Sequence, residues 1–189
     1  MASSHHQYMS REDELLQQIN DIRDNYYQEN GKNVFFKNGQ KREIAEKVCQ
    51  TIDYNDLIHK AIFVVPNTNK IFFDYPLFKT FATPENIGAC QVYLQHTLLP
   101  FILQCYDHFE MHVNLSTFSV SACQRFFNAI KSLFNSTTEL AKQMDSLYIY
   151  YTPHVIEQIR TMLYPVVKHI LPKIVYYSKI ESETKIKQL

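Results

Sequence analysis

The sequence predicts an α/β fold, in which a mixed, mostly parallel five-stranded sheet carries flanking helices and follows a short α-helical segment. Apolar segments of strand length alternate with segments of helical periodicity, and this alternation is typical of parallel strands joined by helices. Only the turn residues 67–70 separate the first two apolar segments, which predicts one antiparallel hairpin. Hydrophobic residues make up 46% of the chain, enough for the core that such a sheet requires.

Composition divides the chain into three parts. Residues 1–60 are charged and helically periodic, and we expect an N-terminal helical segment there. Residues 61–178 contain few charges and form the predicted α/β domain. Residues 179–189 are a polar tail.

Two helices are predicted in the N-terminal segment. The first covers residues 10–28, with Ser10 as its cap and acidic residues in its first turn. Its apolar stripe should dock the helix on the domain or on a second subunit, and it consists of Leu15, Leu16, Ile19 and Ile22. The second helix is predicted over residues 41–52.

The strands of the domain are predicted from apolar segments bounded by turn residues. They cover residues 61–66, 71–75, 109–115, 146–151 and 173–177. Alternation on the fourth strand places Tyr148 and Tyr150 on one face and Ile149 and Tyr151 on the other. Such aromatic residues either fill a core or line an apolar cavity or contact surface.

The helices of the domain are predicted from periodicity and from proline positions. A long helix covers residues 84–108, and Pro100 should kink or divide it. Another begins near Ser119 or Ser121, with Val120, Cys123, Phe127, Ile130 and Phe134 on its apolar face. Pro165 should separate the last two helices, which are predicted over residues 154–164 and 166–171.

The charge balance and the segment lengths exclude several classes of protein. The 19 basic and 19 acidic residues give a pI near 7.1, whereas nucleic-acid-binding domains usually carry a basic surplus, so we expect no nucleic-acid partner. Three glycines leave no glycine-rich phosphate-binding loop. No apolar signal segment opens the chain and no apolar run is long enough to cross a bilayer. We therefore expect a cytoplasmic protein with at most transient membrane contact.

Two groups of residues were candidates for chemistry, and we expect neither to act. Cys105, His108 and His112 have spacings compatible with metal ligation only if they share a helix, and His112 is predicted on a strand. Cys123 lies near a predicted helix start but shares an apolar face with Phe127, which indicates core packing. The prediction is a non-enzymatic protein with no catalytic residue, metal or cofactor.

Three segments carry a resemblance to a known family. They are AIFVVPNTNKIFF, FEMHVNLSTFSVSACQRFFNAIKSLF and MDSLYIYYTPHVIEQIRTMLYPVVKHILPKIVYYSK. Together they make residues 61–178 resemble a CRAL-TRIO domain, the lipid-binding fold of phosphatidylinositol-transfer and retinal-binding proteins, and especially its short BCH-type relatives. STAS domains have a similar central strand and helix, so a STAS domain is the alternative interpretation.

The resemblance implies a site for a lipid or another apolar small molecule. In the CRAL-TRIO arrangement helices cover one sheet face, and the other face lines a cavity beneath the late helices. The residues it would place there are Tyr148, Tyr150, Ile159, Met162, Leu163, Val166, Val167, Ile170 and Tyr176. A lipid carrier needs a cavity of roughly several hundred Å³. Two alternatives remain: these side chains form a plain core, or the chain is a protein-interaction adaptor, possibly a homodimer.

Overall fold

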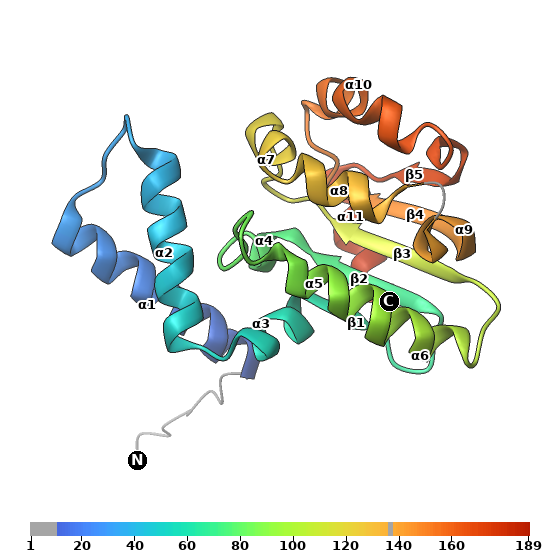
Figure 1. Ribbon diagram of the computed structural model, residues 1–189, viewed down its shortest axis with the longest axis horizontal. Helices are drawn as coiled ribbons and strands as arrows, with labels where there is room; N and C mark the ends of the chain where they lie inside the picture. Colours follow the sequence, from blue (N-terminus) through green and yellow to red (C-terminus); the bar gives the residue numbers. More distant parts are fainter. Residues whose placement is uncertain (1–10, 136–137) are drawn as a thin grey trace, which may run out of the picture.

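The computed structural model describes residues 11–135 and 138–189, together with the side chains from Glu14 onward within those ranges. It is an α/β structure with a five-stranded mixed sheet flanked by helices, and a helical hairpin precedes the sheet (Figure 1). The predicted fold class is therefore confirmed. Ser10, the predicted helix cap, lies outside the described residues.

The sheet has its strands in the order of the sequence. β1 and β2 are antiparallel, and the pairs from β2 to β5 are parallel. All five predicted strands are present with slightly shifted ends: β1 is Ile62–Val64, β2 Lys70–Asp74, β3 Phe109–Asn114, β4 Met144–Tyr150 and β5 Ile174–Tyr176. Each is a short apolar segment, so the local pattern locates it well.

The N-terminal hairpin consists of α1, Arg11–Asn30, and α2, Lys37–Thr51, and both predicted helices are present. Leu15 and Ile19 are buried in the core and Ile22 is half-buried. Leu16 is 46% exposed, so its predicted docking on the domain is wrong, while docking on a second subunit stays a prediction. Adjacent positions of a helix are about 100° apart, which turns Leu16 away from the face of Leu15 and Ile19. The hairpin extends away from the sheet (Figure 1).

Two further short helices flank the β1–β2 hairpin in the chain, α3 before it and α4 after it. In α3, Tyr54–Ala61, the side chain of Asp53 accepts hydrogen bonds from the backbone N–H groups of Asn55 and Asp56. This cap satisfies two amides at the start of the helix. α4, Tyr75–Phe78, follows β2 directly. Neither helix is among those predicted from periodicity, because each is too short to show it.

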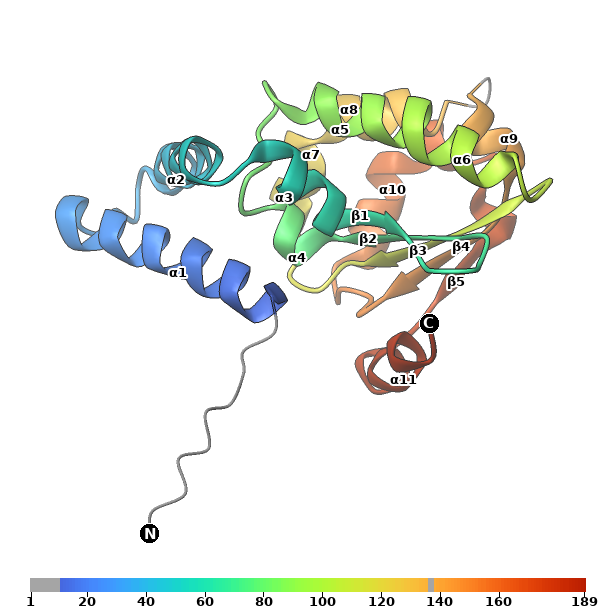
Figure 2. The ribbon, with the colours of Figure 1, turned by 90° about the horizontal axis from the view of Figure 1, so that it is seen from below.

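One layer of helices covers a single face of the sheet (Figure 2). It contains α5, Ile87–Tyr93, with η1, Leu94–Leu98, and α6, Leu99–Leu103; then α7, Val120–Arg125, α8, Phe127–Leu133, α9, Glu139–Gln143, and α10, Ile156–Val167. The resemblance implied that the late helices lie over the other face. That is wrong, since residues of α5, α8 and α10 border one common cavity.

The two prolines predicted to break helices act differently. Before Pro100 the helix widens into the π-helical turn η1, where the N–H of Leu99 donates to the carbonyl oxygen of Leu94, so a π-helical turn interrupts the α-helix while the helical backbone continues. Pro165 does not separate two helices, because α10 continues through it to Val167. Proline removes only the bond from position 165, and the next turn closes with the N–H of Lys168 donating to Tyr164. The segment predicted as helix 166–171 then ends in turns and the 3₁₀ helix η2, Leu171–Lys173.

The polar tail forms a helix on the opposite face of the sheet. α11, Lys179–Lys185, begins with a reciprocal cap between Ser178 and Glu181 and continues as the 3₁₀ helix η3, Ile186–Gln188. Figure 2 shows it below the sheet, while the main helix layer lies above. Among the described residues, no helix has the length and apolar character that a bilayer span requires.

Candidate functional site

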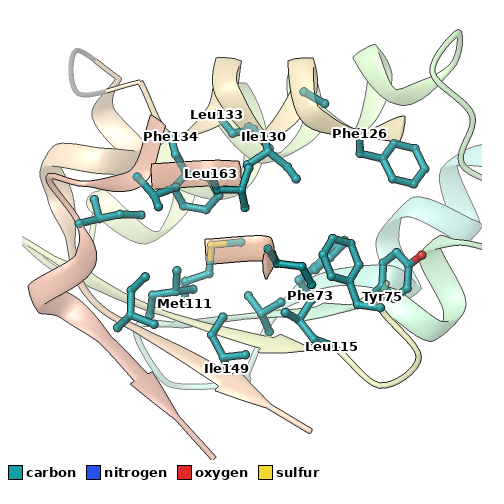
Figure 3. Close-up of a pocket in the computed structure, with 18 of the residues that line it drawn as sticks. Phe73, Tyr75, Met111, Leu115, Phe126, Ile130, Leu133, Phe134, Ile149 and Leu163 are labelled. Atoms are coloured by element: carbon teal, nitrogen blue, oxygen red, sulfur yellow. The ribbon is translucent and has the colours of Figure 1, made fainter. Parts of the chain in front are cut away.

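The candidate site is an apolar cavity of about 190 Å³ between the sheet and the helix layer. Figure 3 shows Met111, Ile149 and Leu115 reaching into it from the sheet side, while Ile130 and Leu163 face them from the helices. Strand register builds the floor, because residues paired across neighbouring strands point to the same face. One such row is Phe73, Val113, Ile149 and Tyr176, and all four line the cavity.

The roof of the cavity comes from the helix layer. On α10 the lining positions Ile156, Ile159, Leu163 and Val167 follow helical spacing and form one apolar stripe. α8 contributes Ala129, Ile130 and Leu133, and the preceding helices contribute Ile87, Cys90 and Leu94. The cavity therefore has apolar walls on both sides.

Few polar groups border this cavity. The amide of Gln91 donates to the carbonyl oxygen of Ala129 at 3.1 Å, so it is satisfied within the fold. Arg160 is the one charged residue that lines the cavity in the described part of the chain, and its guanidinium lies 3.7 Å from Glu157. Burial raises the pKa of the Tyr176 hydroxyl, and the nearby Arg160 opposes that shift. The arrangement offers an apolar body and one cationic end.

The structure brings together five of the nine predicted site residues. Ile159, Leu163, Val167, Ile170 and Tyr176 line the cavity. Contact of these residues with a ligand stays a prediction. The other four, Tyr148, Tyr150, Met162 and Val166, do not line it.

The reason for each misplacement is geometric. On β4 it is Leu147 and Ile149 that point into the cavity, so Tyr148 and Tyr150 share a face as expected but point away from the roof. On α10, Met162 and Val166 each lie one position before a lining residue, Leu163 or Val167, which turns them aside by about 100°.

Most residues of the cavity floor and some of the roof were not predicted from the sequence. Phe73 lies on β2, Met111 and Val113 lie on β3, and their alternation is visible in the sequence. Alternation shows that they share a face, but not which face the helices cover. Ile130 and Phe134 belong to an apolar face that was predicted but not connected with the site.

Tyr148 and Tyr150 belong to an aromatic cluster on the opposite sheet face. The Nδ1 of buried His112 lies 2.7 Å from the hydroxyl of Tyr150, and its Nε2 lies 3.2 Å from Glu110. The rings of His112 and Tyr148 stack with centroids 4.7 Å apart, and Tyr150 stacks on Tyr177 at 5.3 Å. Burial lowers the pKa of His112 despite the attraction of Glu110. These partners satisfy the cluster internally, as expected of packing rather than ligand binding.

The residues first considered for metal ligation or nucleophilic chemistry lie apart. Cys105 is exposed after α6, His108 is exposed 3.9 Å from Asp145, and His112 is buried on β3. Across residues 11–135 and 138–189, no cluster of three or more His, Cys, Asp or Glu side chains has metal-binding geometry. Cys123 is buried, and burial raises the pKa of its thiol, which disfavours the nucleophilic thiolate.

Comparison of the chain with protein-family models found no match, and comparison with curated proteins found none either. The function is therefore argued from the cavity and its surroundings.

Proposed function

We propose that this chain binds a small apolar ligand between the helix layer and the sheet. The observation that carries the proposal is the cavity of about 190 Å³ with apolar walls on both sides. A cavity of about 150 Å³ with similar walls holds benzene in an engineered protein, whereas drug-sized ligands occupy roughly 300–1,000 Å³. The size supports a single ring or a short acyl segment. A larger lipid tail requires the roof to move outward.

The energetics favour an occupant. Cavities left by truncated side chains in closed cores cost about 24 cal/mol per Å³, so an unfilled apolar cavity of about 190 Å³ is unfavourable in the same sense. The total stability of a domain is only about 5–15 kcal/mol. A ligand that contacts these walls would offset part of the free-energy cost of the unfilled cavity through dispersion and burial.

The lining also supports a ligand with two different ends. An acyl or aromatic body suits the apolar walls, and a carboxylate or hydroxyl end suits Arg160. The proposal assigns no catalytic step. The resemblance of residues 61–178 to CRAL-TRIO domains supports an apolar ligand, although the cavity here lies between the sheet and its single main helix layer and not on the other sheet face.

The test compares two neighbouring positions of α10. Leu163→Trp fills the cavity and should abolish octanoic acid binding measured by calorimetry, with an unchanged or higher melting temperature. Met162→Trp is the matched control outside the lining, and it should bind octanoic acid like the wild type. Retained binding by a destabilised Leu163→Trp protein would contradict the site. Native mass spectrometry of the purified wild type should show a co-purified small molecule.

An adaptor function is the second candidate, and the edge strand β5 favours it. β5 has three residues and pairs with β4 on one side, while Val175 and Tyr176 are exposed large hydrophobic residues. Such an edge can pair with a strand of a second chain. The same native mass spectrum reads the subunit count: a ligand-free dimer would favour the adaptor, and a ligand-bound monomer the carrier.

A further inference from the structure

The loop between α1 and α2 exposes three consecutive large apolar residues. Val34 is 68% exposed, Phe35 94% and Phe36 71%, and the two phenylalanines are the most exposed aromatic residues of the described chain. The loop stands at the end of the hairpin away from α3 (Figure 1). We call residues 31–37 the hairpin tip. Apolar groups gathered at a protruding position are typical of interaction sites.

The tip is held in one shape by its own polar side chains. The Oδ1 of Asn33 accepts hydrogen bonds from the N–H groups of Phe35 and Phe36. Gln40 is buried, accepts from the N–H of Asn33 and donates to the carbonyl oxygen of Gly31. Gly31 itself takes a positive φ of 65°, which glycine adopts without strain. The loop therefore satisfies backbone groups internally while it presents its apolar side chains outward.

The charges around the tip are positive. Residues 30–41 contain Lys32, Lys37 and Lys41 and no acidic residue. A polar cleft begins at Asn38, directly beyond the tip, and its lining includes Lys41, Lys79 and Arg125. Arg42 also borders it but is paired with Glu46 and Glu85. The pKa of Lys79 is lowered by burial and by the neighbouring Lys41, which indicates crowded cations.

We propose that the hairpin tip docks on an anionic lipid surface, with Phe35 and Phe36 inserted among the lipids and Lys32, Lys37 and Lys41 against the headgroups. Backbone groups that are already hydrogen-bonded within the loop lose few hydrogen bonds to water when the loop enters a bilayer. Their desolvation therefore costs little free energy. Aromatic side chains favour the bilayer interface, and adjacent lysines are attracted to anionic headgroups. A second protein copy would present the same three lysines, so charge complementarity favours the lipid surface. The docking stands independently of whether the cavity binds a ligand.

The experiment measures sedimentation of the full chain with vesicles of two compositions. The wild type should bind vesicles of phosphatidylcholine with a minority of phosphatidylserine, and bind phosphatidylcholine alone at least about tenfold more weakly. Phe35→Ser with Phe36→Ser should lower binding to the mixed vesicles by about tenfold or more. Lys32→Glu with Lys37→Glu should lower it similarly, and salt should weaken the wild type.

Matched controls lie elsewhere on the surface. Val92→Ser with Phe101→Ser removes two exposed apolar side chains from α5 and α6, and Lys131→Glu with Lys168→Glu reverses two exposed charges. Both control proteins should bind vesicles like the wild type. Unchanged melting temperatures show that the tip variants fold. Equal vesicle binding by folded tip variants and controls overturns the proposal, as does equal binding of the wild type to both compositions. If the wild type is a dimer that does not bind vesicles, and the tip variants are monomers, the tip contacts a second copy of the chain instead.

Discussion

At the scale of single residues, one serine holds the C-terminal helix against the sheet. Ser182 is fully buried, whereas Ile180, the apolar residue of the same helix, is exposed. Its hydroxyl donates to the carbonyl oxygen of Ser178 at 2.6 Å and accepts from the N–H of Tyr151 at 2.7 Å. Tyr151 has a positive φ of 50°, which is unusual for an aromatic residue. The hydroxyl of Ser182 thus stabilises the unusual backbone conformation of Tyr151 after β4.

Ser182→Ala should destabilise the protein by about 1 kcal/mol or more, because the part-buried N–H of Tyr151 loses its acceptor. Urea unfolding measures the change. Ser132→Ala, at an exposed position of α8, is the control and should stay within about 0.5 kcal/mol of the wild type. Equal unfolding midpoints for the two variants would show that Ser182 does not stabilise the backbone at Tyr151.

His112 gives the molecule a pH-dependent contribution to stability. A carboxylate only accepts hydrogen bonds, so Nε2 of neutral His112 donates to Glu110 and Nδ1 accepts from the Tyr150 hydroxyl. Burial and Lys70 lower the pKa of His112 in the folded state, while Glu110 raises it. As the pH falls through about 6.5, the unfolded chain takes up a proton that the folded state resists. Acidification therefore lowers the free energy of unfolding until the folded-state pKa is reached.

His112→Gln should flatten the pH dependence of stability just below pH ~6.5, because glutamine does not titrate. Urea midpoints measured on both sides of that pH give the difference between variant and wild type. His154→Gln, at an exposed position, is the control and should keep the wild-type dependence. A wild-type slope retained by folded His112→Gln protein would contradict the assignment.

At the scale of elements, the strands were predictable and the orientation of their faces was not. Each strand is a local apolar segment, so β3 and β4 lie within two residues of their predicted ends. Long-range packing determines which face of β4 lies under the helices, and the local sequence does not show it. For that reason Tyr148 and Tyr150 were predicted on the wrong side of the sheet. α11 was not predicted because its docking depends on one small residue, Ser182, rather than on an apolar stripe.

Pro165 limits the rigidity of α10, the helix that supplies much of the cavity roof. Pro165→Ala restores an N–H that can donate to the carbonyl oxygen of Thr161. The unfolded chain gains conformational entropy from the same change, which offsets part of the benefit, so the net stabilisation should be about 1–2 kcal/mol. Hydrogen exchange of the α10 amides should become slower. Pro84→Ala, in an exposed loop, should not slow that exchange. Unchanged exchange in α10 would show that proline does not control its opening.

At the scale of the whole molecule, two apolar features lie in different places. The cavity lies inside the α/β domain, and the hairpin tip lies on the helices that extend away from it (Figure 1). The tip was not predicted, because the sequence shows apolar residues but not their exposure. Ligand binding at one and lipid docking at the other are separate proposals, and separate variants test them.

The sequential order of the strands has a consequence for synthesis. Because β1 to β5 follow one another in space as in sequence, each strand can add to an edge already formed as the chain leaves the ribosome. The cavity floor reaches Ile149 before α10 has been made, so the nascent domain carries an open apolar face at that stage. Translation of residues 156–176 then supplies the α10 part of the roof and the last strand. The segment that completes the cavity is therefore also the one that covers the apolar face of the newborn chain.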